Sequence, residues 1–394
     1  MAAPRRTPVT PHDLQGFNYF RLLGPLLEPL HAAGTARDRA GNRQLCDDQY
    51  ATVLLLYFLS PTVTSLRGLP QATTLAQVQR RFGVRPTALG ALSEAAPVCD
   101  AALLQAVIRE LGHRIPPPAV APERAALQAL TAVDGSLLPA LPKMAWALWQ
   151  DAQHRAAKMH VAFEGLRQIP VGVTVTAGHA SERAEWRRLV QPEGCYVVDR
   201  GSADYALCQD LHDLPCHFIA RVQHNAAYAI QEVRPVAAAA QAAGVQRDCL
   251  IRRVGTAHHT RLLPQPFRVV LVAPGPPPTA GAAAPLVLVT NRLDLDAEVV
   301  ALAYRCRWAV ELFVRWLKCV LGCRHLLSQC AHGVRLQVDV AIIASLLIAL
   351  WVGRPPTTRT YEMLCFYLGG GASDAEAIAH IDRWHFLSPP TRKQ

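Results

Sequence analysis

Four residues in one short segment have the types and spacing needed for chemistry on phosphates. They are Tyr304, Arg307, Glu311 and Lys318, in the run YRCRWAVELFVRWLK. At about 100° per residue, spacings of three, four and seven place them within a sector of roughly 60° on one helix face. A carboxylate flanked by two cations and a phenol suits a metal ion held beside phosphates. The alternative is an ordinary amphipathic helix with ion pairs three or four residues apart. The opposite side is apolar and is expected to pack on a core: Ala309, Val310, Leu312 and Leu317.

Two aspartates upstream could complete a metal site. Asp134 follows the apolar run 130–133 and precedes Gly-Ser, and Asp199 follows the run 196–198 and precedes Arg-Gly. We expect each acid at the carboxyl end of a buried strand, facing a ligand, with the glycine after it letting the backbone turn. A turn or helix-cap residue is the alternative for either aspartate.

Three carboxylates suit in-line displacement at phosphorus, because they can hold the metal ions that this reaction uses. Two divalent cations with oxygen ligands can activate the attacking oxygen and stabilise the leaving oxygen. Carboxylates from two strands and one helix would converge into such a site. Magnesium keeps its remaining coordination positions for water and phosphate.

The spacing of the four residues resembles the Y-(2)-R-(3)-E-(6)-K signature of bacterial insertion-sequence DDE transposases, the family of insertion sequence four. Every position matches. The resemblance implies that Glu311 joins Asp134 and Asp199 as the family's DDE triad, holding two Mg²⁺ ions, with Mn²⁺ as the alternative. It also implies that the tyrosine, arginine and lysine grip a phosphate of the element-end strand. Cut-and-paste transposition through a DNA hairpin is the activity implied.

The stretch around the second aspartate predicts strands and helices in a definite order. Residues 158–165 and 169–178 read as a hairpin, residues 181–189 as a helix with Ser181 as its N-cap, and residues 217–223 as a later strand. The order β-β-β-α-β-α-β is what an RNase H-like core needs. The resemblance points to the same α/β fold.

Further matches to the family lie on the predicted strands. Lys158 and His160 form a K-x-H pair, and Arg221 and Asn225 follow the second aspartate. For Lys158 and His160, exposed polar alternation along a strand and a place beside DNA are equally open.

Strand-like runs separate the fifth strand from the signature segment and predict an inserted, mainly β subdomain. The Pro/Gly/Ala tract 274–285 reads as a surface loop within it. The expected division of the chain is a helical DNA-end-binding domain at 1–122, an RNase H-like core at 123–226 and 286–353, the β-rich insertion at 227–285, and a helical, basic tail at 354–394.

The N-terminal third has a helical pattern and one candidate DNA-reading motif. The stretch TTLAQVQRRFGVRPTALGALSEA resembles a helix-turn-helix in outline, with its turn at Gly83. Arg80, Arg81 and Arg85 would then contact the DNA groove or backbone. A plain helical pair without groove contacts is the alternative.

Length and charge agree with a DNA-binding protein of several domains. The chain has 394 residues, 51% of them hydrophobic, and a net charge of +10. Its isoelectric point is near 9.2. A basic balance suits a polyanionic partner, because neutralised phosphates supply most sequence-independent affinity. The resemblance implies double-stranded DNA, both terminal inverted repeats and target, bound by a homodimer on paired ends.

The eleven cysteines predict reduced thiols rather than disulfides or a zinc site. None forms a CxxC pair, and the N-terminus lacks the apolar stretch of a signal peptide. We therefore expect a cytoplasmic, nucleoid-associated protein. The apolar segment 338–352 is short for a membrane span and contains Asp339, so it predicts the last core helix and no membrane partner.

Two other functions stay open on sequence grounds. A structure-specific nuclease with an RNase H fold would share the three acids, but would not need the N-terminal helices or the tyrosine, arginine and lysine grip. A domesticated DNA-binding protein would have lost catalysis, usually with a damaged triad.

Overall fold

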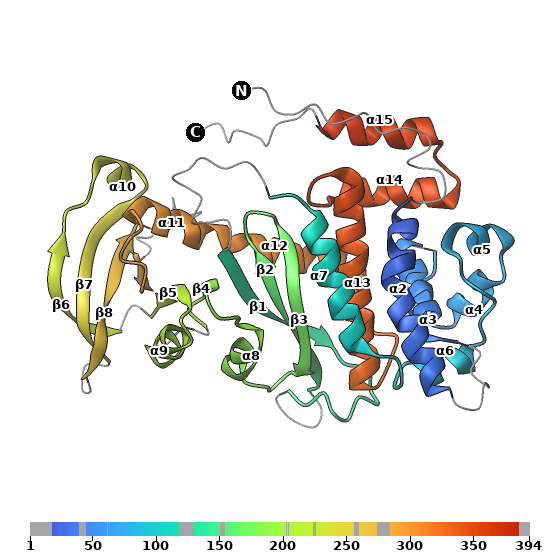
Figure 1. The fold of residues 1–394 in the computed structure, drawn as a ribbon, viewed down its shortest axis with the longest axis horizontal. Helices are drawn as coiled ribbons and strands as arrows, with labels where there is room; N and C mark the ends of the chain where they lie inside the picture. The colour runs from blue at the N-terminus through green and yellow to red at the C-terminus, as the bar shows by residue number, and fades with distance from the viewer. Residues whose placement is uncertain are drawn as a thin grey trace.

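The fold is a mixed α/β arrangement around one large sheet (Figure 1). The computed structural model describes residues 18–38, 45–60, 62–117, 130–149, 154–201, 203, 205–223, 226–255, 260–273 and 284–385. Asn225 and nearly all of the predicted loop at 274–285 lie outside these described residues.

The described part of the sheet has nine strands in the order β3-β2-β1-β4-β5-β9-β8-β7-β6. Antiparallel pairing joins β3, β2 and β1, whereas β4 is parallel to both β1 and β5. The first five strands and the helices between them are β1 (Leu130–Pro139), β2 (Ala156–Glu164), β3 (Ile169–Ala177), α8 (Glu182–Leu189), β4 (Cys195–Val198), α9 (Tyr205–Asp213) and β5 (His217–Val222). The predicted hairpin, helix and later strand are therefore confirmed.

The strand-like runs after residue 227 are also confirmed, but they do not form a separate sheet. β9 pairs antiparallel with β5, so β8, β7 and β6 extend the same sheet to its far end. Inside the extension, the buried Arg268 and Asp248 lie 2.7 Å apart at their nearest atoms. The elements are β6 (Ala227–Arg234), α10 (Ala238–Ala242), β7 (Val245–Gly255), β8 (Thr260–Val272) and β9 (Leu286–Thr290).

Helices cover the opposite end of the molecule, as the N-terminal pattern predicts (Figure 1). Their apolar faces share one core with the C-terminal helices. Two long-range contacts tie them together: the Gln105 amide donates to Asp339, and the Tyr361 hydroxyl to the Phe58 carbonyl. These helices are α2 (Asn18–Arg37), α3 (Asp47–Leu59), α4 (Gly68–Thr73), α5 (Ala76–Phe82), α6 (Leu89–Ala95) and α7 (Ala101–Arg114).

The predicted core helix is confirmed as α13 (Ala331–Val352), which stands beside α7 in Figure 1. Among the described helices it alone is long and apolar enough to cross a membrane, yet 89% of its most apolar window is buried inside the protein. It is followed by α14 (Thr358–Gly369) and α15 (Asp374–His385), which lie in the tail predicted to be helical. All eleven cysteines are free, as expected.

Candidate active site

Asp134 and Asp199 lie next to each other because of the register between two parallel strands. Ala132 pairs with Val197, and each aspartate is two residues further along its own chain. Asp199 directly follows β4, as predicted. The prediction for Asp134 is wrong in one respect, because it lies in the middle of β1, which continues to Pro139 paired with β2. Since β4 ends at Val198, β1 loses its neighbour on that side and Asp134 lies at the opening.

The signature segment is two helices rather than the single helix that its spacing predicted. α11 (Ala297–Cys306) carries the tyrosine, and α12 (Trp308–Cys319) carries the glutamate and the lysine. Arg307 lies at the break between them and caps both. The break leaves the residues of the signature on one side of the segment, where they meet the end of β4.

Hydrogen bonds and ion pairs link the signature residues to the second aspartate. The Tyr304 hydroxyl donates to Asp199 Oδ1 at 2.8 Å. The Arg307 Nε atom lies 3.6 Å from the same oxygen, and a terminal nitrogen of Arg307 lies 2.6 Å from Glu311 Oε1. The buried Nε has no closer partner among the described residues. Arg307 therefore places its positive charge between two carboxylates.

Burial and crowded charge shift the pKa values of this site. Burial, together with the charge of Glu311, raises the pKa of Asp134 to about 6. Burial and the charge of Asp199 raise the pKa of Tyr304 to about 12, so its phenol stays a hydrogen-bond donor. Burial alone would lower the pKa of Arg307, but Asp199 and Glu311 outweigh it and the pKa is raised. The site is thus crowded with negative charge that one arginine balances in part.

Lys318 fixes α12 against the strand that carries the first aspartate. Its ammonium donates to Ser136 Oγ at 3.1 Å and to the Leu137 carbonyl at 2.8 Å. Asp134, Ser136 and Leu137 are close neighbours on β1, so this contact sets the distance between the helix and the aspartate.

The apolar side of α12 packs on the core only in part. Val310 and Leu317 are fully buried, as predicted. The prediction for Leu312 is wrong, since 49% of it is exposed, next to the 53%-exposed Trp308. Both border a pocket of about 420 Å³ between α12 and the β2–β3 turn.

Lys158 lies beside the triad on β2, together with a carboxylate that the sequence did not single out. Its ammonium lies 2.6 Å from Glu182 Oε1, and the charge of Glu182 contributes to the raised pKa of Asp134. A Cβ atom on Gly135 would lie 2.9 Å from Lys158 Cε and 3.1 Å from Glu182 Oε1, so a larger residue at this position would displace the ends of these two side chains. The only sequence signal for Glu182 was its place at the start of a predicted helix.

His160 lies on β2 opposite Gly135 of β1 and is buried rather than at the surface. It is 1% exposed, and its Nε2 atom lies 3.0 Å from Thr176 Oγ1. Burial and the charge of Lys158 lower its pKa, so the ring is neutral. Exposed alternation is therefore wrong for His160, and its place beside DNA stays a prediction.

The donor set of the triad fits divalent metal ions. Three carboxylates approach one opening from two strands and one helix, and carboxylate oxygens are the ligands that Mg²⁺ and Mn²⁺ prefer. The pKa of Asp134 is raised first by burial and then by the neighbouring negative charge of Glu311, which a cation would neutralise. Arg307 supplies part of the compensating positive charge from the protein side.

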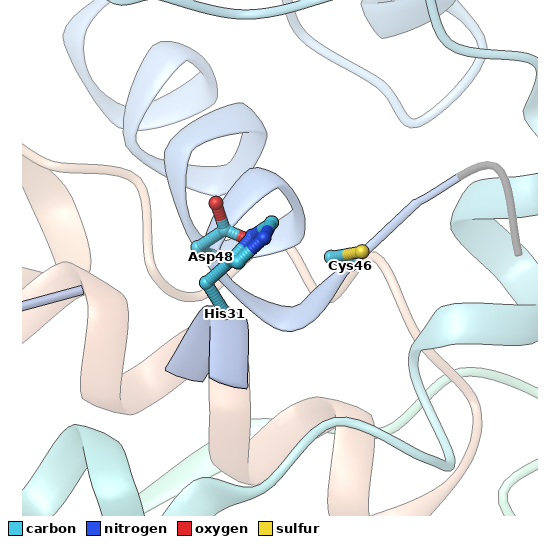
Figure 2. Close-up of side chains that lie close together, drawn as sticks. All are labelled: His31, Cys46 and Asp48. Atoms are coloured by element: carbon cyan, nitrogen blue, oxygen red, sulfur yellow. The ribbon is translucent and has the colours of Figure 1, made fainter. Parts of the chain in front are cut away.

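A second group of metal-ligand types lies in the N-terminal helices (Figure 2). His31, Cys46 and Asp48 have ligand atoms within 4.8 Å of one another. His31 Nδ1 lies 3.2 Å from Asp48 Oδ1, which joins α2 to α3. Burial and the charge of Asp48 raise the pKa of Cys46, and a protonated thiol is a poor ligand. The pairing of His31 with Asp48 gives this group a structural role.

The helix-turn-helix outline matches the observed elements. α5 ends at Phe82, Gly83 adopts a left-handed φ of 65°, and α6 begins at Leu89. Arg80 and Arg85 are exposed, whereas the Arg81 side chain lies outside the described residues. The structure does not bring these arginines to the triad, and their contact with DNA stays a prediction.

Comparisons with known proteins point to one family. The family model described as "Transposase DDE domain" matches residues 126–347. A putative transposase, y4zB, of Sinorhizobium fredii is 25% identical over 222 residues, which cover 56% of this chain and 60% of that protein. A probable transposase for insertion sequence element IS5377 of Geobacillus stearothermophilus is 35% identical over 79 residues, 20% of this chain and 21% of that protein. The matches thus span less than two thirds of either relative.

A solved structure, of the piggyBac transposase synaptic complex with hairpin DNA, is also similar. The TM-score is 0.42 at 12% identity, with 98% of this chain and 85% of that chain covered. A likeness this distant assigns neither fold nor function.

Proposed function

This chain belongs to the transposase DDE domain family, and we propose that it is a cut-and-paste transposase of the insertion sequence four type. It cleaves and joins the ends of a DNA element by phosphodiester transfer at Asp134, Asp199 and Glu311. The observation that carries the proposal is the junction at Arg307, which lies against both Asp199 and Glu311, where the end of β4 meets the signature helices beside the parallel strand β1.

Domains of this family generally use divalent metal ions. The three carboxylates would hold two of them, Mg²⁺ by preference. When bound, the ions activate the attacking oxygen and stabilise the leaving oxygen. Because Arg307 and Lys318 are cations beside the opening, they orient the phosphate, the first with a fork of donors and the second as a point charge. The Tyr304 phenol stays protonated and donates a hydrogen bond.

The proposed sequence of reactions uses one site throughout. Hydrolysis of one strand exposes a 3′-hydroxyl at the element end, which attacks the opposite strand to give a hairpin. The hairpin is reopened by water, and the 3′-hydroxyl then attacks target DNA. At each step one P–O bond forms and another breaks, and the displaced oxygen leaves with the proton released by the attacking group.

The same proposal includes the fold and the layout of the chain. The order β3-β2-β1-β4-β5, antiparallel and then parallel, supports an RNase H-like core, with the strands β6 to β8 as its insertion. The helices before residue 123 would bind the element ends. We extend the proposal to a homodimer on paired ends and to a cytoplasmic, nucleoid-associated location.

A structure-specific nuclease would share the three carboxylates, so the test must measure joining of DNA strands as well as their cleavage. The purified chain is incubated with a duplex ending in the terminal inverted repeat that flanks its reading frame, with Mg²⁺ and a target plasmid. We expect nicked, hairpin and plasmid-joined products, and none in EDTA. Nicking without hairpins or joined products would assign the chain to the nucleases and overturn the proposal.

A further inference from the structure

A pocket of about 610 Å³ opens where three distant segments of the chain meet. The first segment follows α3, the second leaves β1, and the third follows α12. The pocket thus lies between the N-terminal helices and the sheet that carries the triad. Its lining residues are Thr64, Ser65, Leu66, Pro139, Ala140, Leu141, Arg324, His325, Leu326 and Leu327.

The pocket lies further along β1 than Asp134 and the contact that Lys318 makes with this strand. β1 runs from Asp134 to the pocket wall at Pro139, a distance of about 17 Å at a rise of about 3.3 Å per residue. Between them, Lys318 reaches β1 at Ser136 and Leu137. A carboxylate, a lysine and then the pocket therefore follow one another along one strand.

The polar groups of the pocket suit an anion. Arg324 and His325 are exposed at its rim, and Thr64 and Ser65 add hydroxyl groups. No lining residue is acidic. The Arg324 Nε atom donates to His325 Nε2 at 3.3 Å, and among the described residues the terminal nitrogens of Arg324 have no acceptor. A guanidinium with free terminal donors binds a phosphate by two parallel hydrogen bonds.

The segment that carries the basic pair is held in place from the core. Gly322, with φ of 72°, turns the chain after α12. The buried amide of Gln337 then donates to the His325 carbonyl and accepts from the Leu327 backbone N–H, both at 2.8 Å. A buried side chain that binds both sides of this segment leaves its basic residues little conformational freedom to lose on binding.

We propose that this pocket binds a backbone phosphate of the element-end DNA, with Arg324 as its principal contact. The proposal rests on the proposed function and deepens it, because it defines the path of the DNA from the triad towards the N-terminal helices. At a duplex rise of about 3.4 Å per base pair, 17 Å places this phosphate about five base pairs from the cleaved bond. Contacts of this kind fix the register of the protein on DNA and read no sequence.

The test joins a protein change to a DNA change. In the full chain without divalent metal, affinity for the terminal-repeat duplex is measured while single phosphates are replaced by neutral methylphosphonates. For the unsubstituted protein we expect one position, about five base pairs from the cleavage site, where neutralisation weakens binding about tenfold. Arg324→Ala should weaken binding of unmodified DNA about tenfold and abolish the sensitivity at that position. It should also lower the salt slope by about one phosphate.

Matched variants separate this contact from general loss of charge or folding. Arg109→Ala removes another exposed arginine, on α7, and should keep the sensitivity. Ser65→Ala, a small change in the same pocket, should weaken binding in the same direction by less. Unchanged sensitivity at that phosphate in Arg324→Ala would overturn the proposal. The proposal would also be overturned if the pocket bound inorganic phosphate but Arg324→Ala left DNA affinity unchanged.

The outcome is distinguishable from failure of the proposed function, because binding is measured without cleavage. Coupling between Arg324 and one phosphate in a chain that cuts no DNA would support this site and reject the catalytic proposal. Cleavage and joining without that coupling would reject this site alone.

Discussion

Charged residues at the triad have fixed partners within the protein, whereas the described arginines of the α5–α6 helical pair are exposed. At the triad, Tyr304, Arg307 and Glu311 are bound to one another or to Asp199 at fixed distances. On the helical pair, Arg85 is exposed and Arg80 reaches only the carbonyl of its own helix at 3.4 Å. Under the proposed function, the catalytic groups would be preorganised by the protein, whereas the groups that read DNA would find their partners only in the complex. Changes at the triad should therefore affect stability and rate, and changes on the helical pair affinity alone.

The largest effect that tests this contrast is expected from Arg307→Ala. The guanidinium lies between two carboxylates and beside the proposed phosphate, so its loss should slow strand cleavage about 10²- to 10³-fold. Arg307→Lys should restore little, because an ammonium lacks the fork. Arg305→Ala is the matched control and should cleave normally, since Arg305 binds the Ala243 carbonyl instead. Strand cleavage at the normal rate by Arg307→Ala would show that the preorganised Arg307 guanidinium does not contribute to cleavage.

A smaller effect is expected on the stability of the metal-free protein from Asp134→Asn. The folded chain holds a proton on Asp134 up to about pH 6, whereas the unfolded chain releases it near its ordinary pKa of 3.8. Ionised Asp134 therefore destabilises the fold as the pH rises through this window. Asp134→Asn should raise the free energy of unfolding by about 1–3 kcal/mol at pH 7, with no gain below pH 4.

Urea unfolding in EDTA across this pH range measures the effect of Asp134→Asn. Asp294→Asn is the control of opposite sign, because the hydrogen bond from Arg292 lowers the pKa of Asp294 to about 2. Its stabilisation is present at pH 7 and is lost as the pH falls towards 2, so the substitution should destabilise at pH 7. An equal gain in the free energy of unfolding for Asp134→Asn at pH 4 and pH 7 would contradict the raised pKa of Asp134.

Effects on DNA affinity alone are expected from the helical pair. In the full chain, Arg80→Ala or Arg85→Ala should each weaken binding of terminal-repeat DNA by about 1–3 kcal/mol, without changing unfolding. Competition with scrambled DNA then separates a base contact, which loses discrimination, from a phosphate contact, which loses affinity for both DNAs equally. If neither variant changes either quantity, the helical pair is not the reader. The full chain is required because these helices share their core with α13.

The sequence predicted what depends on local spacing. The Tyr304–Lys318 pattern identified a site because residues of one segment keep their relation through the break at Arg307. The break itself was not predictable, since no glycine or proline marks it and one of the two carboxylates that Arg307 contacts, Asp199, comes from elsewhere in the chain. The exposure of Leu312 was not predictable from the spacing either.

Features made by distant pairings escaped prediction. Asp134 lies in mid-strand because β1 pairs with β4 only as far as Ala132 but with β2 as far as Pro139, which only the register shows. The addition of β9 to β5 joins strands separated by a long insertion. Glu182 reaches the site because α8 returns over β2, and its type alone resembled an ordinary first-turn acid.

The central claim is that Asp134, Asp199 and Glu311 form one metal-dependent active site, and single-turnover cleavage of terminal-repeat DNA tests it most directly. With Mg²⁺, alanine at any one of the three should slow cleavage more than about a thousandfold while DNA binding is retained. Asp210→Ala, which removes an exposed aspartate paired with Arg187, should cleave normally. Cleavage at the unsubstituted rate by any of the three alanine variants would remove that residue from the site and contradict the account.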